Sequence, residues 1–362
     1  MARLSGYLLR LFSVEAMALF GVAGFLLFLI QCLRLFDVVS DKGQNLLTLL
    51  GQAMLGMPAL GIVFLYVCLG IGLGRALRNL QATSELQIIH AGALLGALYR
   101  AVGLYALLGT IAVLILAHII EPLSVRATSQ WSASIAADLV SRSMIPHRFT
   151  EVVGDVSMVI GSRDAGGNIT DFFADDRRDE NSRRTYFAKS AIITRDEQGY
   201  VLRMEKGALQ YFGPDQRFSQ VSFDRYDLAL DRLTGAPTDD DPLAQTPSND
   251  LVVQALATQQ WDTAMLRTLL KRTGEGLRVI AMCALVVGVA AFPSGKRRRF
   301  EIPIEFVVLG AAFLERAITS FLPKTGLLGI GIGSLLLLAV ALAINAARLR
   351  IFPPVRFGRA VA

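Results

Sequence analysis

Six long runs of apolar residues decide what this 362-residue chain can fold into. A helix needs about 20 mostly apolar residues to cross a bilayer. The runs cover residues 14–33, 52–73, 102–120, 277–292, 302–321 and 327–347, and the fourth is short enough that we expect its helix to begin before Glu275. At 53% hydrophobic and 18% charged residues, the chain is also too apolar for a soluble protein of this length. We therefore predict an α-helical membrane protein with six transmembrane helices in two groups of three.

A hydrophilic segment separates the two groups. Residues 156–160, 200–204 and 220–224 mix β-branched and aromatic side chains with polar ones in alternation, and residues 165–168 form a turn signal. Residues 128–139 favour a helix that leads into the segment, and residues 234–250, rich in Pro, Asp and Thr, favour a linker that leads out. We predict helices 1–3 within 1–125, an inserted all-β domain at 126–262, and helices 4–6 with a tail within 263–362.

The short loops on one side of the predicted helices are basic. Lys and Arg accumulate in cytoplasmic loops of membrane proteins. Here they are Arg3, Arg10, Arg75, Arg78, Arg100, Lys296, Arg297, Arg298, Arg299, Arg348, Arg350, Arg356 and Arg359. Both termini are therefore expected to be cytoplasmic, with the central domain on the outer side of the inner membrane. The net charge of +6 then needs no nucleic acid to explain it.

Several enzyme and metal-site classes are disfavoured. Cys32, Cys68 and Cys283 lie inside apolar runs, and the three histidines lack metal-ligand spacing. The chain has no P-loop, since Gly295-Lys296 is followed by Arg297, and it has neither Gly-x-Ser-x-Gly nor His-Glu-x-x-His. We expect a transport subunit without a cofactor of its own.

The first candidate site is an amphipathic segment near residues 83–95, between the second and third runs. Ser84 or Thr83 can cap a helix there, and Leu86, Ile89 and Ala93 fall on one face. The segment either docks into a groove on a soluble partner or rests on lipid, and composition alone does not decide. Its candidate residues are Ser84, Glu85, Leu86, Ile88, Ile89, His90, Ala91 and Gly92.

The second candidate site is a set of basic residues at the outer membrane boundary. They either extend to phospholipid headgroups or hold lipid phosphates in charge-assisted pairs. Glu315 could instead be a structural partner of Arg316. The set comprises Arg34, Lys42, Lys271, Arg272, Arg278, Arg316 and Lys324.

The chain resembles the LptF/LptG permease family, which extracts lipopolysaccharide from the inner membrane of Gram-negative bacteria. Residues 33–43, 84–92, 187–193 and 200–207 carry the resemblance, and 33–37 with the His90-Ala91 pair look more like LptF. One departure is that Glu275 and Arg278 are three positions apart, where the family commonly has four. Both spacings keep the pair on one helix face.

The resemblance implies specific partners. Residues 84–92 would be the coupling helix in a groove of the LptB ATPase dimer, which binds ATP and Mg²⁺, and an LptG-type subunit would complete the permease. The central domain would be a periplasmic β-jellyroll that continues into LptC and LptA. Two alternatives remain: an ion-coupled secondary transporter, disfavoured because the runs are nearly free of charge at their centres, and a membrane-anchored sensor or scaffold, which would lack an output domain.

Overall fold

The computed structural model describes residues 2–41, 46–92, 94–143, 146–153, 155–164, 166–179, 182–196, 199–213, 217–229, 242–292, 303–321 and 330–351. Internal contacts divide the chain into two compact units. Unit 1 combines Met1–Val125 with Pro242–Ala362, and unit 2 is Arg126–Asp241. Lys42, Lys324 and Ala93 lie outside the described residues.

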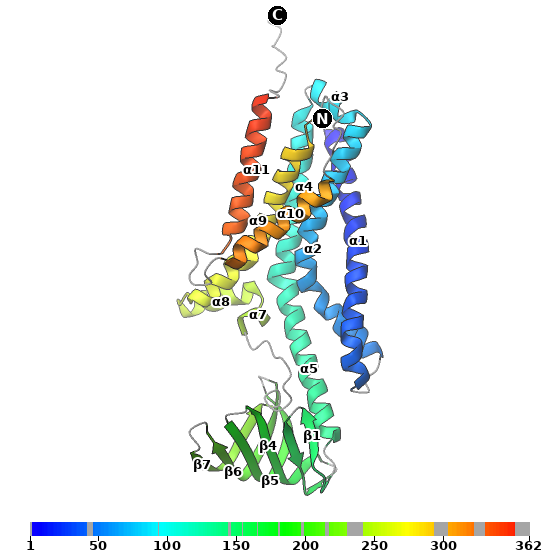
Figure 1. The fold of residues 1–362 in the computed structure, drawn as a ribbon. Helices are drawn as coiled ribbons and strands as arrows, with labels where there is room; N and C mark the ends of the chain where they lie inside the picture. Colours follow the sequence, from blue (N-terminus) through cyan, green and yellow to red (C-terminus); the bar gives the residue numbers. More distant parts are fainter. Residues whose placement is uncertain are drawn as a thin grey trace, which may run out of the picture. The chain divides into compact units, whose positions relative to one another are not determined.

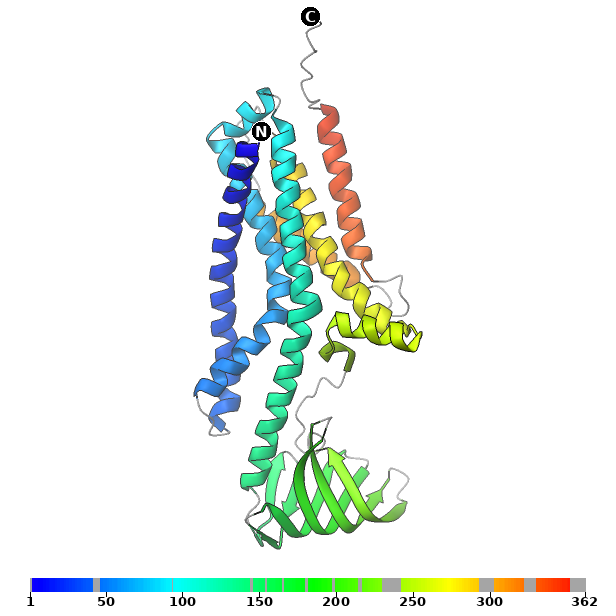
Figure 2. The same ribbon diagram turned by 180° about the vertical axis from the view of Figure 1, so that it is seen from behind.

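Unit 1 is helical (Figures 1 and 2). Its elements are α1 (Ala2–Asp41), α2 (Leu46–Ala82), α3 (Glu85–Ala91), α4 (Leu95–Ile115), the π-helix η1 (Leu116–Ile120), the start of α5 (Glu121–Ser143), α7 (Pro242–Gln245), α8 (Ser248–Thr258), α9 (Thr263–Ala290), α10 (Ile304–Phe321) and α11 (Ile332–Ile351). The beginning of α1, the helix α3 and the end of α11 lie at the same end of unit 1 (Figure 1).

Five helices in the described part of the chain are long and apolar enough to cross a membrane. They are Arg3–Phe36, Leu49–Ala82, Leu95–Ser132, Thr263–Ala290 and Ile332–Arg350. The helix α10 has 18 residues but carries Glu305, Glu315 and Arg316. The chain is thus a mainly helical membrane protein, and the sixth crossing stays a prediction. As expected, the helix of the fourth run begins before Glu275. It starts at Thr263, where Asp262 caps α9 by accepting a hydrogen bond from Ala264 N–H.

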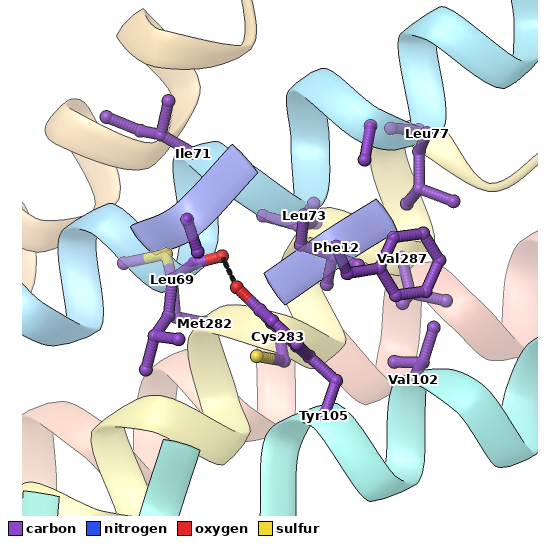
Figure 3. Packing of buried hydrophobic residues seen from close by; sticks show 14 of the residues in the cluster. Phe12, Leu69, Ile71, Leu73, Leu77, Val102, Tyr105, Met282, Cys283 and Val287 are labelled. Atoms are coloured by element: carbon purple, nitrogen blue, oxygen red, sulfur yellow. Dashed lines mark hydrogen bonds between the residues drawn. The ribbon is translucent and has the colours of Figure 1, made fainter. Parts of the chain in front are cut away.

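Small residues let the helices of unit 1 approach closely. A Cβ atom at Gly72 would lie 2.6 Å from the Cα of Ala16 on α1. The glycines at 70, 72 and 74 of α2 permit this close packing. Apolar side chains from α1, α2, α4 and α9 fill the core between them, and the buried Tyr105 hydroxyl donates to the Leu69 carbonyl at 2.9 Å (Figure 3).

Unit 2 is built around one antiparallel sheet. Its strands are β1 (Thr150–Val153), β2 (Val156–Val159), β3 (Ser162–Arg163), β4 (Asn168–Asp179), β5 (Ser182–Asp196), β6 (Gly199–Phe212) and β7 (Phe218–Ala229). The order is β1-β2-β4-β5-β6-β7, with β3 paired to β4. The three predicted strands lie in β2, β6 and β7, and the predicted lead-in helix lies in α5. A closed jellyroll stays a prediction, because the described strands form a single sheet.

The segment after the sheet differs from expectation. Part of the predicted linker, residues 242–250, contributes to α7 and α8. These two short helices contact α9 and η1 and group with unit 1. A polar, proline-containing sequence favours a linker. However, Pro and Ser also occupy helix starts, as Pro242 and Ser248 do here.

Candidate functional site

The helix α3 has one buried face and one exposed face. Leu86 is fully buried and Ile89 is 4% exposed, both in the unit 1 core. Ile88 is 65% exposed, and Gln87 and Ala91 near it are also exposed. The apolar face recognised in the sequence therefore packs within the protein. A partner docked on α3 would meet the face that carries Ile88.

The predicted side-chain cap of α3 is wrong. Ser84 precedes the helix with φ 62°, and its side chain makes no capping hydrogen bond. The Thr83 hydroxyl bonds back to the Asn79 carbonyl at 3.2 Å and also to Glu85 Oε1 at 3.2 Å. Thr83 and Ser84 are the only two residues between α2 and α3. Both form hydrogen bonds with carbonyl groups in the last turn of α2.

A contact distant in the sequence attaches α3 to the end of α9. The His90 Nε2 atom lies 2.9 Å from the Ala291 carbonyl oxygen. The His90 ring also contacts the Phe292 ring, with 5.9 Å between centroids. A displacement of α3 would therefore act on the C-terminal end of α9 as well as on its neighbours α2 and α4.

A buried charged trio links α9 to α10. Arg278 donates through Nε to Glu315 Oε1 at 2.9 Å and through an Nη atom to Glu275 Oε1. The side chain of Glu315 is 2% exposed and that of Arg278 is 15% exposed. The second carboxylate oxygen of each glutamate is buried without a hydrogen-bond partner among the described residues.

This trio lies between two helices and bears on one expectation. The helix α9 starts at Thr263, so Glu275 and Arg278 lie well inside that helix. Glu315 pairs with Arg278 and is not the ion-pair partner of its neighbour Arg316. Instead, Arg316 Nε lies 3.4 Å from the Tyr66 hydroxyl, and its guanidinium is 5.9 Å from that ring's centroid.

The predicted basic set does not share one environment. Arg34, Lys271 and Arg316 are exposed in the isolated chain, whereas Arg278 belongs to the trio. Arg272 is only 6% exposed. Its guanidinium donates to the Thr246, Leu243 and Ala244 carbonyls and to the Ser248 hydroxyl. It thus holds the end of α7 and the start of α8.

Sequence reasoning placed Glu275 on the same helix face as Arg278, and the two form an ion pair, but it missed Glu315 and the partner of His90. Glu315 is 37 positions from Arg278, so no local spacing indicates their contact. One signal was available: charged residues inside transmembrane helices are usually paired with one another. Applied to the fourth and fifth runs, this rule leaves few combinations to test.

Comparison with known proteins points to one family. A family model described as lipopolysaccharide export system permease LptF/LptG matches residues 6–351. The match therefore includes four of the candidate spans in full, nearly all of the first, α10 and the sheet. A search of curated proteins finds no match to the chain.

Proposed function

Since the chain belongs to the LptF/LptG family of lipopolysaccharide export permeases, we propose that it is one of two permease subunits in an ATP-driven transporter. The family match over residues 6–351 carries this proposal. In it, six spans cross the inner membrane with both termini in the cytoplasm. A second permease subunit of the LptG type, an LptB ATPase dimer, LptC and LptA are the proposed partners.

The coupling step is assigned to α3. Its Ile88 face is exposed, while Leu86 and Ile89 fix it to the core. The His90 contact with Ala291 gives the helix a second attachment at α9. Force applied by an ATPase at α3 would thus reach α2, α4 and α9 together. Of the predicted coupling residues, Leu86 and Ile89 hold the helix in place, and Ser84, Glu85, Ile88, His90, Ala91 and Gly92 are proposed for this surface.

The lipid-handling step is assigned to the exposed cations. Arg34, Lys271 and Arg316 are accessible, and Lys and Arg hold phosphates in charge-assisted pairs. Lipopolysaccharide would enter between the two permease subunits, and closure driven by ATP would expel it toward the central domain. A jellyroll formed by that domain would pass acyl chains onward, with an open strand edge available for pairing with a partner sheet.

Glu85→Lys tests the coupling step. Charge reversal at the start of α3 is expected to leave ATP hydrolysis intact and to reduce lipopolysaccharide release several-fold. Release and hydrolysis are measured together in vesicles that contain the complete complex. Wild-type release with wild-type ATPase association in this variant would contradict the assignment.

One observation favours a second candidate, an ion-coupled transporter. Buried ionisable residues inside transmembrane helices are typical of such proteins, and the Glu275–Arg278–Glu315 trio is of this kind. Purification of the chain from its native membrane separates the candidates. We expect an ATPase dimer and a second permease subunit to accompany it, and release to require ATP. Release that follows an ion gradient without these partners would instead support the alternative.

A further inference from the structure

The sheet of unit 2 carries a transverse row of four charged residues, which we call the crease. In β4 and β5, the pairs Thr170–Ser190 and Phe172–Ala188 flank Asp171 and Lys189. The same level in β6 and β7 holds Lys206 and Asp224, between the paired residues Glu205–Arg225 and Gly207–Phe223. Asp171 has φ 49° and Lys206 has φ 53°. Such backbone is uncommon outside glycine and persists where the surrounding structure imposes it.

The crease residues point away from the buried core of the sheet. On one side of the row, Ile169 and Met204 are buried, and on the other side Phe172 and Ala188 are buried. All four crease side chains are exposed. At Gly207, a Cβ atom would lie only 2.1 Å from the Phe187 carbonyl oxygen. Strands β5 and β6 therefore approach each other too closely at position 207, next to this row, for any residue but glycine.

An aromatic groove adjoins the crease on its exposed side. Phe173 pairs with Phe187, and Phe187 pairs with Ala208, so these three form a cross-strand row. The Phe173 ring contacts the rings of Phe149 and Phe187 edge to face, at centroid distances of 6.0 and 5.0 Å. Phe149 is 68% and Phe187 is 38% exposed. The groove has a volume of about 410 Å³ and is also lined by Lys189 and Lys206.

Lys189 and Lys206 are the cationic residues of the groove. Among the described residues of the chain, neither forms a salt bridge. An ammonium beside an apolar surface is suited to a ligand that has an anionic head and a hydrocarbon chain. Asp171 also lines the groove, so a head with one or two negative charges fits it better than a head of higher charge.

We propose that the crease groove binds a single-chain anionic amphiphile. Its chain lies against Phe173 and Phe187, and its phosphate-like head lies between Lys189 and Lys206. The groove is on the side of the sheet opposite its buried core. This proposal goes beyond lipopolysaccharide export and does not require it, because it depends only on residues of unit 2.

Photolabelling of the full-length chain tests the proposal. The protein is held in nanodiscs of zwitterionic phospholipid, and dodecyl phosphate with a diazirine in its chain is added and irradiated. Adducts are mapped by peptide mass spectrometry. We expect saturable labelling of the peptides that contain Phe173 and Phe187. An uncharged dodecyl maltoside with the same diazirine is expected to label them at least about tenfold less well.

Variants identify the head-binding residues. Lys189→Gln and Lys206→Asn should each raise the half-saturating concentration about tenfold; Asn is chosen because it tolerates a positive φ. Arg217→Gln removes an exposed cation elsewhere on the sheet and should change nothing. Retained wild-type protease resistance shows that the variants fold.

Four outcomes would overturn the proposal. Competition by inorganic phosphate at the same concentration would indicate a free-anion site. Equal labelling by the uncharged probe, or labelling unchanged by both lysine variants, would leave the aromatic face as a surface for a protein partner. Labelling spread evenly over unit 2 would indicate no site.

Discussion

At the scale of single residues, the trio in unit 1 is the feature most sensitive to change. One guanidinium serves two buried carboxylates, so its removal leaves both without their cation. Breaking a buried ion pair in this way costs about 3–5 kcal/mol. We expect Arg278→Leu to lower the thermal unfolding temperature of the purified protein strongly. Arg316→Leu, at an exposed position on α10, should change stability by less than about 1 kcal/mol.

A compensating variant separates charge from packing. If unpaired carboxylates cause the loss, Glu275→Gln and Glu315→Gln added to Arg278→Leu should recover much of it, because both remaining groups are then neutral. No recovery in the triple variant would show that the guanidinium acts through shape and packing.

The acid sensitivity of unit 2 should depend on Asp175. This carboxylate is 3% exposed. Burial opposes its charged form, but hydrogen bonds from Arg183, Arg177 and Thr185 outweigh burial and lower its pKa below the ordinary value. A lowered folded-state pKa stabilises the sheet above the unfolded-state pKa, and this contribution is lost as pH falls toward the folded-state pKa.

Asp175→Asn therefore should destabilise unit 2 at neutral pH and weaken its dependence on acid. The loss of charged hydrogen bonds is expected to cost about 1.5–3 kcal/mol. Limited proteolysis of the full chain over a pH series measures this. Asp224→Asn, at an exposed position of β7, is the control. An acid dependence as steep in Asp175→Asn as in the wild type would contradict the prediction.

At the scale of elements, two adjacent isoleucines of α3 have opposite environments, since Ile89 is buried and Ile88 is exposed. Ile89→Ala removes buried contacts and should cost about 2–5 kcal/mol of stability. Ile88→Asp changes an exposed side chain and should leave stability unchanged. It should instead weaken association with the proposed ATPase, by about 2 kcal/mol if Ile88 fills a pocket. Thermal unfolding and co-purification of both variants distinguish the two faces. A stable Ile88→Asp chain that retains the ATPase would place the contact elsewhere.

Elements defined by local periodicity could be predicted, whereas contacts between distant elements could not. The apolar runs and the alternation at 156–160 correspond to helices and strands because burial acts on neighbouring positions. The face of α3 that is free for a partner could not be predicted, since periodicity identifies an apolar face but not what covers it. Likewise, Arg272 was grouped with lipid-binding cations because its acceptors on α7 and α8 are 24 to 29 positions away.

The crease shows the same limit in the sheet. An alternation pattern predicts a strand, but extra residues in adjacent strands shift the pattern without a signal of their own. Gly207 ends the 200–207 segment that carries the family resemblance. Only the 2.1 Å that would separate a Cβ atom from the Phe187 carbonyl oxygen explains why this residue must be glycine.

At the scale of the whole molecule, the topology depends on α10. Five described helices are apolar enough to span, and an odd number of crossings would put the termini on opposite sides. The helix α10 carries three charged residues. Of these, Glu315 forms an ion pair with Arg278. Glu305 lies in the first turn of α10 and accepts a hydrogen bond from Arg75 Nε at 2.8 Å. Charges satisfied by protein or placed at the end of a span can be tolerated in a membrane. We therefore expect α10 to cross.

Cysteine labelling tests this crossing. On a background without native cysteines, Pro303→Cys and Ser320→Cys mark the two exposed ends of α10. A membrane-impermeant maleimide, applied after the outer membrane is permeabilised, should label Ser320→Cys directly and Pro303→Cys only after lysis. Ser222→Cys on the sheet and Ser84→Cys before α3 are the references for the outside and inside. Labelling of both α10 positions from one side would mean that the helix is re-entrant. The end of α11 would then face outward. This orientation would contradict the positive-inside prediction made from Arg348 and Arg350.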